Sequence, residues 1–291
     1  MTKLRQRLLP YALLAPGLIW LILFFVIPMY FMWELSLKTG SLADGFQLTW
    51  AWENYSDSIS EYSTQFIRAF YYAGTATVIC LFLGYPLAYA IAFKGGRWKN
   101  LMLFAVIAPF FTTYLIRTIA WKTILDDSSF VVGVLKTLHI VPQDGRVLAT
   151  SGAVIAGLTY NFLPFMILPL YASLERLDLR LIEASKDLYA NARTTFFKVT
   201  VPLTMPGIIA GILLTFIPAA GDYVNSTFLG GTQQAMIGNV IQSKYLVIND
   251  YPVAAALSFT LLVIILIALL FYIKFAGTGA LMGDEDEEET G

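Results

Sequence analysis

The stretch PVAAALSFTLLVIILIALLFYI occupies residues 252–273 and contains no charged side chain. A helix needs about 20 mostly apolar residues to cross the hydrocarbon core of a bilayer, so this stretch is long enough to span a membrane. Membrane-spanning strands would instead show alternating segments of about ten residues, which the sequence lacks. The sequence therefore predicts an all-α integral membrane protein with six transmembrane helices. Their approximate ranges are 8–37, 66–93, 101–125, 147–171, 206–224 and 252–275.

The overall composition agrees with this prediction. Hydrophobic residues make up 57% of the 291 residues and charged residues only 13%, with a mean hydropathy of +0.67. About a quarter of an ordinary soluble domain is charged, so a soluble fold of this composition could not cover its own surface. Cys80, the only cysteine, lies in the second apolar stretch, which excludes an intrachain disulfide.

Lysine and arginine residues are concentrated in alternate loops. Most of the 19 lie before the first apolar stretch, between the second and third, between the fourth and fifth, and after the sixth. Such residues are enriched in cytoplasmic loops, so we expect both termini in the cytoplasm and three external loops. The first apolar stretch is longer than the core of a secretory signal peptide, and we expect it to be a retained helix.

No internal repeat and no proline- or serine-rich linker divides the chain. We therefore expect residues 1–283 to form a single transmembrane domain. Residues 284–291 begin with the acidic run DEDEEE. A block of like charge repels itself, so we expect a disordered, solvated tail there.

The sequence lacks the residues that common enzyme chemistries require. His139 is the only histidine, which excludes a histidine-based triad and an HExxH zinc site. No GxxxxGK[ST] phosphate loop occurs, so the chain is not expected to hydrolyse ATP by that route. Asp222 is the only acid clearly inside an apolar stretch, whereas an intramembrane aspartyl protease needs two. We expect a non-catalytic chain with no metal and no cofactor of its own.

The only long cytoplasmic segment, 173–204, mixes apolar and charged side chains. A disordered linker would contain fewer apolar residues, and a membrane span could not carry this many charges. The pattern predicts amphipathic helices outside the bilayer. Their apolar face could dock in the groove of a partner protein, or it could lie on lipid headgroups or on the chain's own helices. The pattern alone leaves these alternatives open.

Three pieces of this segment resemble a known motif: EASKDLYA at 183–190, FFKVTVPL at 196–203, and Pro206-Gly207. Together they resemble the EAA loop of ABC-importer permeases, in which E-A-A is followed by three residues, a glycine and a spaced I-x-L-P. The resemblance implies a type I importer permease whose coupling helix docks in a cleft of a separate ATPase subunit. Position by position, it assigns coupling to Glu183, Ala184, Ser185, Asp187, Tyr189 and Ala190.

Two residues depart from the family pattern. Ser185 replaces the second alanine, which is a mild change. Tyr189 stands where the family has glycine, a residue that would permit a turn or a close approach to the partner. A bulky aromatic residue there predicts a straighter helix, or a partner cleft altered to accept the ring.

Further segments resemble the spermidine/putrescine branch of this family. The resemblance implies a bacterial inner-membrane permease that pairs with a second permease, homologous or identical. It also implies two ATPase subunits that bind ATP and magnesium, and an external binding protein. Because specificity in such systems rests largely with the binding protein, thiamine, a metal chelate or a sugar is an alternative cargo. The segments are YLIRTIAW at 114–121, LPFMILPLY at 163–171, GDYV at 221–224, LGG at 229–231, IGNVI at 237–241 and NDYP at 249–252.

A pathway for polycations should offer carboxylates, carbonyls and aromatic faces. An ionisable residue inside a span is costly, which makes Asp222 a candidate by default. Asp222 could instead form a structural pair with Arg117, or act as a cap, and Tyr160 could simply pack. The full set of pathway candidates is Asp222, Tyr223, Tyr160, Glu34 and Asp126.

An ATP-independent secondary transporter is the alternative from another class. It would favour paired repeats with broken helices and several intramembrane ionisable groups. Neither feature is evident in the sequence, and segment 173–204 would then have no purpose. Co-purification with an ATPase would distinguish the two classes.

Overall fold

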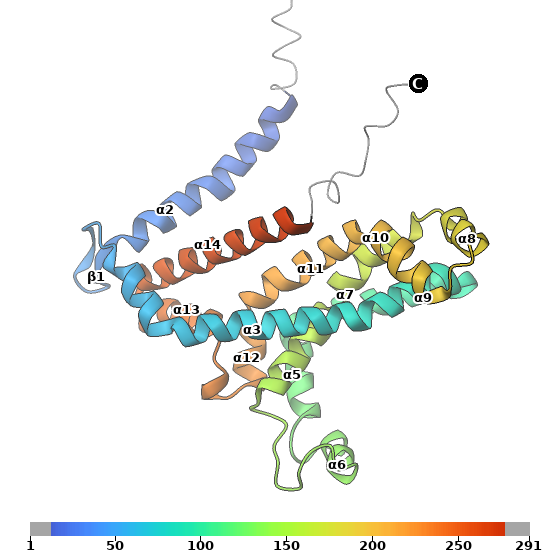
Figure 1. The fold of residues 1–291 in the computed structure, drawn as a ribbon. Coiled ribbons are helices and arrows are strands. Elements are labelled where there is room, and N and C mark those ends of the chain that lie inside the picture. Colours follow the sequence, from blue (N-terminus) through green and yellow to red (C-terminus); the bar gives the residue numbers. More distant parts are fainter. Residues whose placement is uncertain (1–12, 277–291) are drawn as a thin grey trace, which may run out of the picture. The chain divides into compact units, whose positions relative to one another are not determined.

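A computed structural model describes residues 13–276 of the chain, and this part is predominantly helical (Figure 1). The all-α prediction is therefore confirmed. The acidic tail at 284–291 and the basic residues of the N-terminus lie outside the described residues.

The chain divides into two compact units. The first comprises residues up to Ser63 together with Val240–Leu262, and the second comprises Thr64–Asn239 together with the residues from Val263 onward. Three helices contain a boundary between the units: α3 (Glu53–Tyr89), α13 (Ile237–Ser243) and α14 (Tyr251–Ala276).

The first unit contains a β-hairpin that hydropathy alone does not indicate. It follows α2 (Ile27–Ser36), and its strands β1 (Lys38–Ser41) and β2 (Gly45–Leu48) pair antiparallel. The amide of Asn54 donates hydrogen bonds to the Ser36 and Lys38 carbonyls at 2.8 and 3.0 Å. These bonds hold the beginning of α3 against the start of the hairpin.

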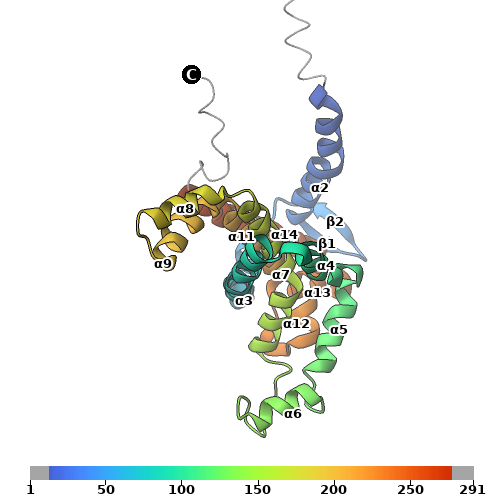
Figure 2. The same cartoon turned by 90° about the vertical axis from the view of Figure 1, so that its right-hand side faces the viewer.

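The second unit contains most of the helices. Figures 1 and 2 show α8 and α9 at one end of α7, with α5, α6 and α12 toward the other end. The helices of this unit are α4 (Lys99–Ile107), α5 (Tyr114–Ile124), α6 (Phe130–Thr137), α7 (Ser151–Glu175), α8 (Leu179–Asp187), α9 (Ala192–Thr195), α10 (Val201–Leu203), α11 (Met205–Ala220) and α12 (Val224–Leu229).

The core of the second unit is the contact between α7 and α11. Glycines on α11 permit this close approach, as small residues do at many transmembrane helix interfaces. A Cβ atom on Gly207 would lie 2.5 Å from the Cβ atom of Ser173, and one on Gly211 would lie 2.7 Å from the sulfur of Met166. Buried side chains of α3, including Cys80 and Tyr85, complete this core.

Four described helices are long and apolar enough to cross a membrane. They are Leu13–Ser36, Glu53–Lys94, Ser151–Glu175 and Tyr251–Tyr272. Two bent pairs of helices also pass this test as pairs: Gly96–Phe111 with Tyr114–Ile124, bent by 94°, and Ala192–Leu203 with Met205–Ala220, bent by 67°. The described residues therefore hold up to six spans if each bent pair is one span.

The bends have local causes in the backbone. In the first pair, Thr112 and Thr113 are extended, which ends the helical turn that contains Pro109. In the second pair, Thr204 leaves the helical region (φ −99°, ψ 8°) between two prolines, Pro202 and Pro206. Hydropathy indicates how long an apolar stretch is, but the third predicted helix, 101–125, is interrupted in a way that hydropathy does not reveal.

Candidate functional site

Helix α8 begins and ends within the segment that resembles the EAA loop. A carboxylate oxygen of Asp178 accepts a hydrogen bond from the backbone N–H of Arg180 at 2.9 Å and so caps the first turn. At the other end, the N–H of Tyr189 donates to the Lys186 carbonyl at 2.9 Å, and the N–H of Ala190 donates to the Ser185 carbonyl at 3.0 Å. This pair of bonds is the Schellman arrangement that closes many helices.

Tyr189 takes the left-handed backbone conformation, with φ at 60°. The expectation of a straighter helix is therefore wrong, because the chain turns where a glycine would turn. The two closing hydrogen bonds satisfy carbonyls of the last helical turn and hold the tyrosine in this conformation. The Tyr189 side chain is 97% exposed, and that of Leu188 before it is 81% exposed.

Ser185 joins α8 to α9. Its side chain is buried, and its hydroxyl oxygen lies 2.9 Å from that of Thr195. Glu183, Ala184 and Asp187 are exposed on the same helix. Of the coupling residues that the sequence predicts, Ser185 is thus the one that faces inward. Its hydroxyl group gives a structural reason for the departure from alanine.

We call residues 173–204 the coupling segment, after the resemblance to the EAA loop. This segment contacts the helical core of the second unit through aromatic rings. The ring of Phe196, next to Thr195, meets the ring of Tyr85 on α3 at 5.4 Å between centroids. The Tyr85 hydroxyl lies 2.8 Å from the hydroxyl of Thr204, at the bend before α11. A displacement of α8 can therefore reach both α3 and the bend through packed side chains.

Asp222 lies in a buried polar cluster toward the other end of α7. Its carboxylate accepts a hydrogen bond from the Tyr114 hydroxyl of α5, and another from the backbone N–H of Asn225 at 2.8 Å. The side chain of Asp222 is only 7% exposed. Asp222 thus caps the start of α12 and ties it to α5. This arrangement is the cap that the sequence left open as an alternative to a pathway role.

Asparagine side chains of α7 and α12 extend this cluster. Asn161 on α7 donates to the Asn225 side-chain oxygen at 3.2 Å and to the Thr118 hydroxyl at 3.3 Å. The Asn225 side-chain amide in turn donates to the Tyr114 hydroxyl at 2.6 Å. Tyr114, Asn161 and Asn225 are not among the sequence-predicted residues. An amide inside an apolar stretch, as at Asn161, is the signal that points to such a cluster.

Arg117 does not pair with Asp222 in the structure. Its guanidinium group lies 5.2 Å from the centre of the Phe110 ring and 5.7 Å from that of Tyr114. The side chain is buried, and its Nε and Nη1 atoms have no hydrogen-bond partner among the described residues. Asp222 is already satisfied by Tyr114 and Asn225, so the arginine is held by aromatic faces instead.

The side chains of three further pathway candidates, Tyr160, Tyr223 and Glu34, have surroundings of their own. Tyr160 packs its ring 5.3 Å from that of Trp121, while Tyr223 is 43% exposed. Glu34, in the first unit, forms an ion pair with Lys38 at 2.9 Å.

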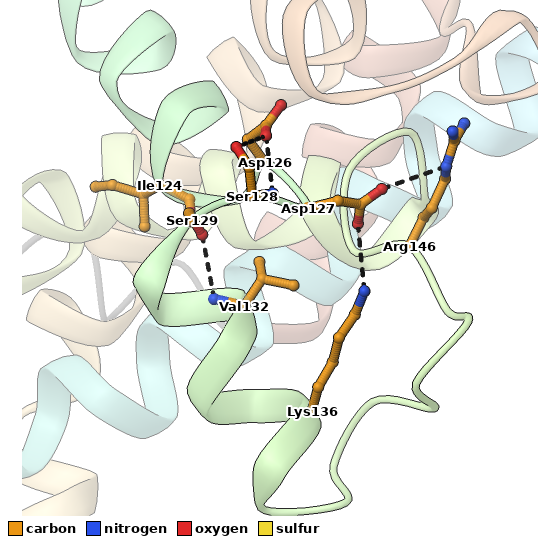
Figure 3. Close-up of polar contacts among 8 residues, drawn as sticks. All are labelled: Ile124, Asp126, Asp127, Ser128, Ser129, Val132, Lys136 and Arg146. Atoms are coloured by element: carbon orange, nitrogen blue, oxygen red, sulfur yellow. Dashed lines mark hydrogen bonds and ion pairs between the residues drawn. The ribbon is translucent and has the colours of Figure 1, made fainter.

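Asp126 lies in the loop between α5 and α6 (Figure 3). One of its carboxylate oxygens accepts hydrogen bonds from the Ser128 hydroxyl at 2.5 Å and from the Ser128 N–H at 3.0 Å. These bonds lower the pKa of Asp126, the side-chain bond most strongly. The neighbouring Asp127 forms an ion pair at 3.3 Å with Arg146, which lies in the loop between α6 and α7, and so ties the two loops together. The described residues hold no cluster of metal-ligating side chains.

Residues 81–275 match the model of the family described as binding-protein-dependent transport system inner membrane component. The chain belongs to this family. The match includes the coupling segment and the buried polar cluster. These permeases are non-catalytic membrane components of ABC importers, as the EAA-loop resemblance implied, and the class of ATP-independent transporters is excluded.

Individual relatives cover nearly the whole permease. The chain is 39% identical to the spermidine/putrescine transport system permease protein PotB of Haemophilus influenzae, over 88% of this chain and 89% of the relative. It is also 39% identical to PotB of Escherichia coli K12, over 87% of this chain and 92% of the relative. The inner membrane ABC transporter permease protein YdcU of the same organism is 36% identical over 72% of this chain and 71% of the relative.

A solved structure has the same fold. A chain of a bacterial ABC transporter involved in the import of the acidic polysaccharide alginate superposes with a TM-score of 0.66, and the match covers 94% of this chain and 97% of that chain. The sequence identity is 20%, so this likeness establishes the type I permease fold alone.

Proposed function

We propose that the chain is the permease subunit of an ATP-driven importer for polyamines such as spermidine and putrescine. One observation carries this proposal: the chain is 39% identical, over about nine-tenths of both lengths, to permeases named for spermidine and putrescine transport. The segments that resemble that branch lie throughout the chain, from residues 114–121 to residues 249–252.

The proposed assembly has four kinds of component. A second permease, homologous or identical, completes the translocation pathway, and an external binding protein delivers the substrate. Two ATPase subunits bind ATP and magnesium, because this chain has no phosphate loop of its own. The alginate transporter with a similar permease fold is described in complex with a ligand-bound periplasmic protein, which supports an external delivery partner. The coupling segment then faces the cytoplasm, together with both termini.

The contacts of α8 support a mechanical role for the coupling segment. ATP binding closes the ATPase pair and moves α8. The Ser185–Thr195 hydrogen bond carries this movement into α9, and Phe196 passes it to Tyr85 and the bend at Thr204. The bend separates α10 from α11, so a change in its angle reorients α11 and opens or closes the pathway.

Within the pathway, we assign Asp222 to capping rather than to substrate contact. Both of its carboxylate oxygens already accept hydrogen bonds in a buried setting. The exposed phenol of Tyr223 is the better candidate for contact with an ammonium group, because an aromatic face attracts cations. Tyr160, Glu34 and Asp126 are secondary candidates.

Uptake by the assembled transporter tests the proposed cargo. The permease pair, the ATPase and the binding protein are reconstituted in liposomes, and uptake of labelled spermidine and putrescine is measured with internal ATP. We expect ATP-dependent accumulation of at least one polyamine, and competition by the other. Competition by thiamine, a metal chelate or a sugar, with none by either polyamine, would overturn the cargo assignment and leave the importer class intact.

A further inference from the structure

Leu188 and Tyr189 are the most exposed large apolar side chains of the described coupling segment, at 81% and 97%. We call this pair the coupling tip. It follows directly after the last residue of α8, Asp187. The side chains project from the segment that the proposed function assigns to coupling, and the described residues leave almost all of the Tyr189 surface uncovered.

The backbone at Tyr189 is unfavourable for a tyrosine. A positive φ of 60° brings the Cβ of an L-residue close to the following carbonyl oxygen, whereas glycine adopts this conformation freely. The exposed ring gains almost no packing against the described residues that would offset the strain. Stability of the permease alone therefore gives no reason for an aromatic side chain here, and strained residues of this kind are often functional.

Hydrogen bonds hold the backbone of the tip in place despite the exposure of its side chains. Two backbone hydrogen bonds fix the turn, from Tyr189 to Lys186 and from Ala190 to Ser185. The bond between Ser185 and Thr195 fixes α8 itself. A backbone that is already fixed loses little conformational entropy when the tip is bound, so this arrangement lowers the cost of docking.

The charges around the tip favour a protein surface over a lipid surface. Helix α8 carries two basic residues, Arg180 and Lys186, and two acidic ones, Glu183 and Asp187. Helices that lie on membranes are rich in lysine and arginine, and anionic headgroups would repel the acid next to the tip. Interspersed charges of both signs suit a protein cleft of complementary charge.

We propose that the coupling tip is an aromatic anchor that enters an apolar pocket of the ATPase subunit, and that Tyr189 selects an ATPase whose cleft has room for the ring. This inference rests on the proposed function. The ATPase is the fitting partner because the tip is continuous with the coupling segment and the chain must receive its energy from another subunit. Tyrosines are enriched among the residues that dominate protein interfaces, since they combine a large apolar ring with a polar tip.

Variants at position 189 separate the effect of the aromatic ring from the effect of the backbone turn. Asparagine and glycine both accept the left-handed conformation, so Tyr189→Asn and Tyr189→Gly remove the ring but keep the turn. Tyr189→Phe keeps the ring. Phe130→Ala, at an 86% exposed aromatic residue of α6, is the matched control because α6 and α8 lie toward opposite ends of α7.

Association is measured by titrating the purified ATPase into the intact permease pair in lipid nanodiscs. We expect Tyr189→Asn and Tyr189→Gly to weaken binding about tenfold or more, and Tyr189→Phe and Phe130→Ala to change it less than about threefold. The melting temperature of the permease without ATPase should stay the same or rise in the asparagine and glycine variants, since strain is relieved. Unchanged binding in both variants would overturn the inference and leave the proposed function standing. Failure of the unaltered permease to bind any ATPase would overturn both.

A fluorescence measurement tests the alternative that the side chain at position 189 lies in the lipid bilayer rather than in a pocket of the ATPase. Tyr189→Trp is compared with Tyr189→Phe in nanodiscs that contain brominated lipids, and the difference spectrum reports position 189 alone. We expect no bromine quenching, and a blue shift when the ATPase is added. Quenching in the absence of the ATPase would show that the ring lies in lipid and would overturn the inference.

Discussion

The hydroxyl oxygens of Ser185 and Thr195 lie 2.9 Å apart, and their hydrogen bond joins α8 to α9. Both side chains are buried although the segment around them is largely exposed. We propose that α8 receives the movement of the ATPase. The hydrogen bond then connects α8 to Phe196, whose ring contacts Tyr85 of the helical core.

Removing the Ser185 hydroxyl should weaken this connection. We expect Ser185→Ala to cost about 1 kcal/mol, because Thr195 loses a buried partner, and to lower the amount of substrate imported per ATP hydrolysed. The double variant Ser185→Ala/Thr195→Val should recover part of the stability, since replacing both partners leaves no hydroxyl unpaired. Uptake and phosphate release are measured together in proteoliposomes. Equal stability and coupling in all three proteins would show that the bond has no role.

A proline inside α8 should uncouple hydrolysis from uptake. Ala184→Pro removes a backbone donor from the helix interior and costs about 3 kcal/mol of helix stability. Ala192→Pro is the matched control, because residue 192 is the first residue of α9 and Asn191 before it is already extended. We expect ATP hydrolysis with little uptake in the first variant and normal uptake in the second. Normal transport by Ala184→Pro would contradict the coupling assignment.

Replacement of Glu183 tests the same assignment without breaking the helix. Glu183 is exposed, so Glu183→Ala should leave the melting temperature of the permease unchanged. We expect a lower uptake rate at an undiminished rate of ATP hydrolysis, because the carboxylate is lost from the surface that we propose to face the ATPase. An equal ratio of uptake to hydrolysis in variant and parent would argue against a role for Glu183.

A methyl group at Gly207 should force α7 and α11 apart. The new Cβ would lie 2.5 Å from the Cβ atom of Ser173 and 2.7 Å from the Pro169 carbonyl oxygen. Overpacking of this kind costs about 1–3 kcal/mol, so the melting temperature of Gly207→Ala should fall by several degrees. Gly133→Ala on α6 serves as the control, since its Cβ would meet nothing within 4 Å. Equal melting temperatures for the two variants would contradict the packing argument.

Substitutions at Asp222 distinguish a cap from a pathway residue. Tyr114→Phe removes a hydroxyl that bonds both Asp222 and Asn225. We expect this variant to lose about 1–3 kcal/mol of folding stability, because both groups lose a hydrogen-bond partner.

Asp222→Asn can still cap α12, so it should retain most of the uptake, whereas Asp222→Ala should lower the melting temperature. Loss of uptake in Asp222→Asn at an unchanged melting temperature would assign Asp222 to the pathway instead.

The sequence by itself determined the class of the protein and showed where the chain resembles the EAA loop. The length and hydrophobicity of a transmembrane helix are properties of one continuous stretch, and a motif such as 183–190 is equally local. The capping of α8 by Asp178 is local as well. These features can be recognised from residues that are neighbours in the chain.

Only the tertiary structure decided which polar groups meet. Tyr114 and Asn225 are 111 residues apart, and Asn161 reaches both Thr118 and Asn225 from a third helix. Because the competition for the Asp222 carboxylate takes place in space, the sequence could not exclude Arg117 as its partner. The turn at Tyr189 is different, because its closing hydrogen bonds are local, and the sequence hid it only because a tyrosine rarely adopts a positive φ.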